Sequence, residues 1–147
     1  MTTMPMKPAV YRTEVEIEAL VRRFEQATLP PAEFNHHAHM TVALWYLARH
    51  PYAEAVDRMR AAITHFAARH HQSQLYNETI TLFWMKLLRH VLDQAEPDAP
   101  LRDTIYAILT KWGSMGYVFQ HYSKDVAFSP EAKARWVEPD LLPMGFP

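Results

Sequence analysis

The sequence contains no cysteine and only three glycines in 147 residues. Without cysteine the chain forms no disulfide, offers no thiolate nucleophile and provides no sulfur ligand for zinc. The three glycines all lie between Gly113 and Gly145, so the long stretch before them holds no glycine-rich loop that could cradle a phosphate. These absences exclude nucleotide binding through such a loop. The lack of cysteine fits a cytoplasmic protein.

The chain also lacks a charge bias and a long apolar run. Lys and Arg total 15 and Asp and Glu total 16, and the basic residues are scattered, which disfavours nucleic-acid binding. The longest uninterrupted apolar run, 42–48, is far shorter than the roughly 20 residues that a membrane span needs. We therefore expect neither nucleic acid nor a membrane as a partner.

What the chain does have is hydrophobic residues at helical spacing. They make up 49% of the sequence, which suffices for one core in a chain of this length. Their periodicity and the scarcity of glycine predict an all-α, single-domain helical bundle of about five or six helices over residues 1–147. Within it, residues 1–10 are expected to form a flexible N-terminal tail, and residues 137–147, with three prolines, an extended C-terminal tail.

Capping residues and prolines predict where the helices begin and end. Thr13, with Glu16 three residues later, forms a capping box, and Pro30 and Pro31 end the first helical segment. The second helix is expected to begin at Pro31 or Asn35, and the helix over 77–94, apolar on nearly all sides, is expected to be central. The expected helices cover 13–27, 35–50, 51–70, 77–94, 101–112 and a short segment opened by Ser129-Pro130-Glu131.

The most informative motif is a pair of histidines, His36 and His39, at the start of an apolar helix. Their side chains share a helix face with Ala43, whereas His37 points about 100° away and is expected nearer the rim. Imidazoles on a stripe that faces the core are costly to bury unless they are hydrogen-bonded, paired or metallated. Two of them one turn apart can bind one metal ion. The alternative is a helix start with exposed histidines, one of which hydrogen-bonds a backbone group.

Two carboxylates are candidates for completing a site with these histidines. Glu78 lies in the first turn of an apolar helix and shares its face with Leu82 and Met85, so it is expected to look into the protein and to need a partner. The alternative is that Glu78 only stabilises the positive end of its helix. Glu25, at the end of the first helix, is the weaker candidate. A nitrogen and oxygen ligand set of this kind suits a divalent Fe, Mn, Ni or Zn ion.

The residues around Glu78 are expected to orient the ligands through hydrogen bonds. They are Tyr76, Asn77, Thr79 and Thr81.

Together, Phe34-x-His36-x-x-His39-Met40 and Tyr76-Asn77-Glu78-Thr79-Ile80-Thr81 resemble an uncharacterised family of small bacterial all-helical proteins. The segment 129–141 is similar to the ending typical of that family, and the resemblance spans about residues 24–141. It supports a site at the two histidines and Glu78 and implies nothing about a substrate. Asn77 departs from the family pattern, which has histidine there. The departure weakens the site if that histidine is a ligand and is mild if it is a cap.

Two functions are compatible with these patterns. In the first, the protein is a small metal-dependent enzyme in which His36, His39 and Glu78, with or without Glu25, hold a divalent ion that keeps open positions for water, dioxygen or a small-molecule substrate. Iron would then favour an oxidoreductase, and zinc a hydrolase or lyase. In the second, the protein is a non-catalytic helical module that binds a small apolar ligand or a protein partner, and the His/Glu cluster is a structural hydrogen-bond network.

Overall fold

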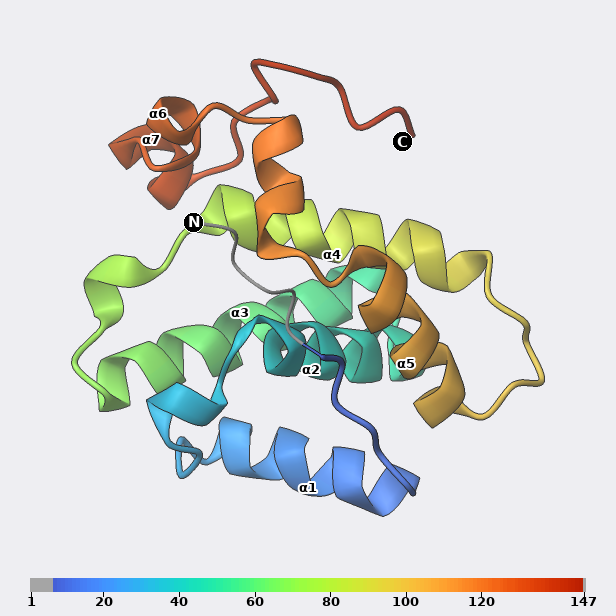
Figure 1. Cartoon of the computed structure of the whole chain (residues 1–147). Helices are drawn as coiled ribbons and strands as arrows, with labels where there is room; N and C mark the ends of the chain where they lie inside the picture. The colour runs from blue at the N-terminus through green and yellow to red at the C-terminus, as the bar shows by residue number, and fades with distance from the viewer. Residues whose placement is uncertain (1–6, 147) are drawn as a thin grey trace.

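The computed structural model describes residues 7–146, and this part of the protein is all-α, without strands (Figure 1). The predicted fold class is therefore confirmed, although the short helix α6 was not predicted. The α-helices are α1 (Glu14–Glu25), α2 (His36–Arg49), α3 (Tyr52–Arg69), α4 (Glu78–Asp93), α5 (Leu101–Trp112), α6 (Lys124–Ala127) and α7 (Pro130–Ala134). Three 3-10 helices lie between them: η1 (Pro31–Glu33), η2 (Ser73–Leu75) and η3 (Met115–Gln120).

Side-chain caps explain where four of these helices begin. The side-chain oxygens of Thr13, Asn35, Asn77 and Ser129 each accept a hydrogen bond from a backbone N–H in the first turn of α1, α2, α4 and α7. Such a bond satisfies an N–H group that has no partner within the helix. Pro31 begins η1 instead of α2, so of the two predicted starts for the second helix the one at Asn35 is right.

The centre of the fold is α2, which packs against α1, α3, α4 and α5. Every residue from Met40 to Leu47 is buried, and Figure 1 shows α2 between α1 and α4. The helix predicted to be central, α4, packs against α2, α3 and α7, but it is less enclosed than α2, because Lys86 and Arg89 stay partly exposed on one of its faces. No helix among residues 7–146 is long and apolar enough to cross a membrane.

The segment after α7 has no regular secondary structure up to residue 146. It is held by hydrogen bonds: the Tyr122 hydroxyl donates to the Val137 carbonyl at 2.5 Å, and His121 Nδ1 donates to the Leu142 carbonyl at 2.8 Å. Leu141 in this segment is 58% exposed, and its backbone N–H donates a hydrogen bond to the His121 carbonyl. Positions 1–6 and 147 of the two predicted tails lie outside the described residues.

Gly113 gives a direct test of how closely α5 approaches α2. A Cβ atom there would lie 2.2 Å from the Leu109 carbonyl oxygen and 2.5 Å from His37 Nε2. We expect Gly113→Ala to lower the free energy of unfolding by about 1–3 kcal/mol, because the end of α5 must shift. Gly116→Ala is the control, since its nearest neighbour would be Ser114 Oγ at 3.6 Å. Urea unfolding measures both, and equal effects would contradict the expected clash.

Candidate functional site

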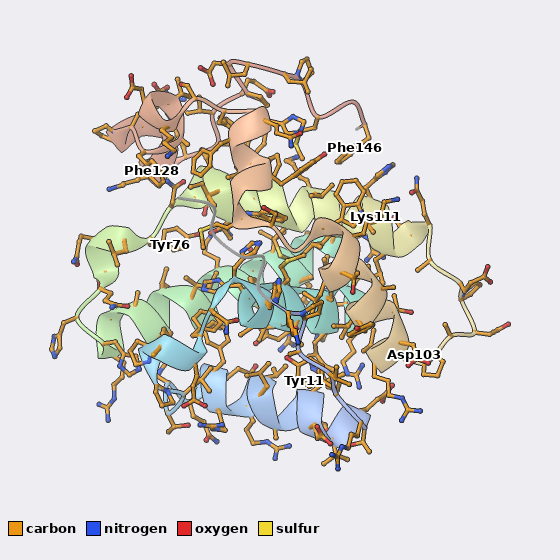
Figure 2. All side chains as sticks on the ribbon, viewed as in Figure 1. Tyr11, Tyr76, Asp103, Lys111, Phe128 and Phe146 are labelled. Carbon is orange, nitrogen blue, oxygen red and sulfur yellow. The ribbon has the colours of Figure 1, made fainter. Side chains whose placement is uncertain are left out.

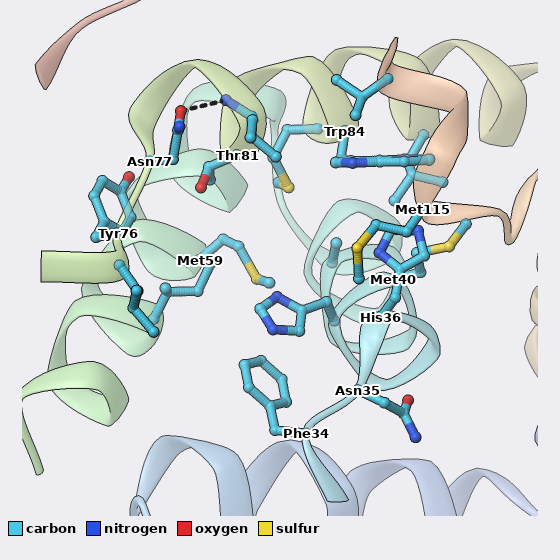
Figure 3. A pocket seen from close by; sticks show the side chains of 18 of the residues that line it. Phe34, Asn35, His36, Met40, Met59, Tyr76, Asn77, Thr81, Trp84 and Met115 are labelled. Atoms are coloured by element: carbon cyan, nitrogen blue, oxygen red, sulfur yellow. Dashed lines mark hydrogen bonds between the residues drawn. The ribbon is translucent and has the colours of Figure 1, made fainter. Parts of the chain in front are cut away.

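The histidine face of α2 lines a pocket of about 340 Å³ between α2, α3 and α4 (Figure 3). His36, His39 and Ala43 all face it, so the helix face predicted from their spacing is confirmed. Met40 joins them from α2. The remaining helices contribute mostly apolar side chains: Met59 and Ile63 from α3, and Ile80, Thr81, Trp84, Met85 and Leu88 from α4.

Aromatic contacts orient the two imidazoles. The edge of His36 meets Trp84, with ring centroids 4.5 Å apart and an interplanar angle of 63°. His39 stacks on Phe34, with centroids 3.6 Å apart, and Phe34 in turn stacks on Phe24 of α1 at 4.1 Å. Both imidazoles are therefore held by apolar surfaces, which favour the uncharged form of the ring.

Burial controls the protonation of the two histidines. It lowers the pKa of His36 to about 4, with a smaller contribution from neighbouring His37, and it lowers the pKa of His39 to about 3, with a smaller contribution from His36. Both rings are thus neutral near neutral pH. Within the described part of the chain, His36 Nε2 is buried and has no hydrogen-bond partner. The hydrogen-bonding capacity of this nitrogen is therefore unused among the described residues.

His37 is the most deeply buried of the three histidines, with 4% of its surface exposed, so its predicted place at the rim was wrong. Its Nε2–H donates to the Gly113 carbonyl at 3.1 Å. This contact forms because the C-terminal end of α5 covers the first turn of α2. His36 and His39 keep part of their surface accessible because they face the pocket.

Glu78 has a cationic partner, but that partner is Arg60 of α3 and not an imidazole. Arg60 Nε lies 3.0 Å from Glu78 Oε1 and its NH2 group lies 2.7 Å from Oε2, while the Tyr76 hydroxyl donates to Oε1 at 2.5 Å. The hydrogen bonds from Arg60 are the main reason why the pKa of Glu78 is lowered. The sequence showed that Glu78 needs a partner, but no pattern connects it with an arginine 18 residues earlier.

The other carboxylate and one of the predicted hydrogen-bonding residues also have partners elsewhere. Exposed Glu25 accepts a hydrogen bond from the Tyr46 hydroxyl at 2.7 Å. The Thr79 hydroxyl donates to the Arg135 carbonyl at 2.7 Å and accepts from the Val137 N–H at 3.1 Å. Thr79 therefore connects α4 to the segment after α7.

Asn77 caps α4 and also donates from its side-chain amide to the Ala127 carbonyl at 2.7 Å, so it holds α6 against α4. Of the predicted site residues, the structure brings five to the pocket: His36, His39, Tyr76, Asn77 and Thr81. Glu25, Glu78 and Thr79 do not line it.

Within residues 7–146, no three His, Asp or Glu side chains gather in a way that could hold a metal ion. The two oxygens of Glu78 are already hydrogen-bonded to Arg60 and Tyr76. The ligand set suggested by the sequence is therefore not assembled in this structure, and the metal ion stays a prediction.

Comparison with protein-family models, with curated protein sequences and with solved structures gave no match. The resemblance carried by the two motifs thus stays a prediction. Function has to be inferred from the pocket itself.

The lowered pKa values predict that acid destabilises the fold. In the unfolded chain His36 and His39 bind a proton near pH 6.5, but in the folded protein only near pH 4 and pH 3. Between these values the unfolded state holds more protons. The free energy of unfolding should therefore fall as the pH drops from 6.5 through 4, by up to about 1.4 kcal/mol per pH unit for each histidine.

Urea unfolding at a series of pH values measures this slope. His39→Gln removes one titrating group and should make the slope shallower, whereas His65→Gln changes an exposed histidine of α3 outside the pocket. A slope that His39→Gln leaves unchanged would contradict the burial effect.

Glu78→Gln tests the ion pair with Arg60. We expect it to lower the free energy of unfolding by about 1–2 kcal/mol, because it removes charge-assisted hydrogen bonds and solvent screens only part of the pair. Glu54→Gln is the matched control, because Glu54 pairs with Arg58 at 3.0 Å while both side chains are about half exposed. Its effect should stay below about 0.5 kcal/mol. If thermal or urea unfolding shows equal losses of stability in Glu78→Gln and Glu54→Gln, the ion pair of Glu78 stabilises the fold no more than an exposed pair does.

Proposed function

We propose that this protein binds a small, mostly apolar molecule in the pocket between α2, α3 and α4. The pocket itself carries this proposal: its volume of about 340 Å³ falls within the roughly 300–1,000 Å³ typical of small-ligand sites, and its lining combines many apolar side chains with a few polar ones. This is the second of the two functions that the sequence suggested.

The character of the lining supports a ligand site. Met40, Met59, Met85 and Met115 all face the pocket, which is half of the eight methionines in the chain. Their unbranched, polarisable side chains adapt to the shape of a bound molecule. Protein interiors are otherwise close-packed, and an unfilled space costs stability. A space kept open beside the central helix α2 is best explained by a ligand that fills it.

The polar groups in the pocket suit an uncharged ligand. Neutral His36 and His39 can form hydrogen bonds without bringing a buried charge. Among the described residues that line the pocket, none is Asp, Glu, Lys or Arg. The pocket can therefore take up apolar surface and offer an imidazole to a single polar group.

Metal-dependent catalysis at His36, His39 and Glu78 stays a prediction from the sequence, as does a cytoplasmic location. Metal analysis of protein purified without a histidine tag tests the first.

Pyrene, an uncharged hydrocarbon whose emission reports the polarity around it, tests ligand binding. We expect saturable binding to the full-length protein. Ala43→Leu fills the pocket from the buried face of α2 and should weaken binding about tenfold or more, because steric overlap costs about 1–3 kcal/mol. Ala67→Leu makes the same change at a buried position that does not line the pocket, and it should leave pyrene binding within about twofold.

If pyrene does not bind the wild-type protein, or if Ala43→Leu and Ala67→Leu have equal effects, the proposed function is wrong. Thermal unfolding of both variants shows that they are folded at the temperature of the titration.

A further inference from the structure

We propose that the ligand is an uncharged single-chain amphiphile whose hydroxyl or carbonyl group hydrogen-bonds His36 and whose alkyl chain leaves the pocket past Leu75 and Phe128. This inference rests on the proposed function and names the class of molecule that the same pocket takes. It follows from the charge of the lining, from the polar groups that are still free, and from the position of the exposed apolar residues.

The lining excludes a charged ligand. The described residues around the pocket include no charged side chain. The nearby ion pair of Arg60 and Glu78 is satisfied internally, since Arg60 and the Tyr76 hydroxyl supply hydrogen bonds to both carboxylate oxygens. A carboxylate or ammonium group placed in the pocket would lose its hydration without gaining a counter-charge, which is costly.

Most polar side chains at the pocket are already committed within the protein. The side-chain oxygens of Asn35 and Asn77 cap α2 and α4, and the Tyr76 hydroxyl donates to Glu78. The rings of His36 and His39 differ from them, because neither makes a hydrogen bond in the part of the chain that the structure describes, and His36 Nε2 is in addition a buried atom without a partner. A neutral imidazole nitrogen donates in one tautomer and accepts in the other, so it can pair with a hydroxyl or a carbonyl.

The pocket has two distinct ends. Figure 3 shows His36 beside Met40, Met115 and Trp84 at one end, Tyr76 and Asn77 at the other, and Met59 between them. A molecule bonded to His36 therefore extends past Met59 toward Tyr76. The flexible methionine side chains along this path adapt to an alkyl chain.

The Tyr76 end of the pocket carries exposed apolar side chains. Leu75 is 63% exposed and Phe128 is 50% exposed, and both line the pocket although they come from separate segments of the chain. At the His36 end one lining residue, Met115, is exposed, at 61%. Figure 2 shows Phe128 and Tyr76 on the same side of the molecule. A single exposed apolar residue is ordinary, but two that converge on one opening mark a surface that a ligand covers. An alkyl chain that leaves the pocket there would cover Leu75 and Phe128, which we call the apolar rim.

Displacement of pyrene by hexanol, octanol, decanol and dodecanol tests the ligand class near neutral pH. Affinity should rise about fourfold for each added methylene, since each contributes to apolar burial, and should level off once the chain has passed the rim. Decanoate has the same chain with a carboxylate and should bind at least about 100-fold more weakly than decanol.

His36→Phe tests the polar contact, because phenylalanine keeps an aromatic ring but offers no nitrogen. It should weaken decanol about tenfold, and more than it weakens pyrene, which has no polar group to lose. His65→Phe is the matched control on the exposed face of α3, outside the pocket. It should change neither affinity.

Phe128→Ala tests the rim. It should weaken decanol and dodecanol about five- to tenfold and hexanol less than about twofold, because only the longer chains reach the rim. Leu142→Ala is the control, since Leu142 is 51% exposed and does not line the pocket.

The outcomes separate the two proposals. Failure of pyrene to bind overturns the proposed function. If pyrene binds but decanoate binds as well as decanol, or His36→Phe leaves decanol unaffected, only the amphiphile is overturned. If Phe128→Ala weakens the binding of short and long alcohols equally, or weakens neither, the alkyl chain does not cross the rim. That result overturns the path argued above.

Discussion

The burial of α2 on all sides is the constraint on which the rest of the structure depends. A helix whose residues from Met40 to Leu47 are all enclosed has no place for unsatisfied polar groups in its middle. The histidines of α2 lie in its first two turns, where residues of neighbouring segments contact their side chains. Gly113 accepts a hydrogen bond from His37, and Phe34 stacks on His39. The pocket occupies the space that remains beside this end of α2.

The second consequence is that charge stays outside the pocket. Arg60 and Glu78 form an ion pair, and the Tyr76 hydroxyl donates a further hydrogen bond to the Glu78 carboxylate. Tyr76 also lines the pocket. Burial keeps the two imidazoles neutral. A site with these properties can hold apolar surface and one hydrogen-bonding group, and such a combination sets the selectivity that we propose.

The motif from Tyr76 to Thr81, around which a functional site was predicted, has a structural role in this protein. Asn77 caps α4 and binds the Ala127 carbonyl, and Thr79 binds backbone groups of Arg135 and Val137. Two residues of this motif thus hold α6 and the segment after α7 against α4. An asparagine at position 77 is well suited to this task, since its side chain accepts one hydrogen bond and donates another.

The sequence by itself determined the fold class, the helix starts at Thr13, Asn35 and Asn77, and the helix face shared by His36, His39 and Ala43. These features depend on groups within one or two turns of each other, whose hydrogen bonds and periodicity are local. Only the tertiary structure decided that His37 is buried on Gly113, 76 residues away, and that Glu78 pairs with Arg60. The open pocket likewise depends on how α2, α3 and α4 pack, and packing between distant segments leaves no periodic signal in the chain.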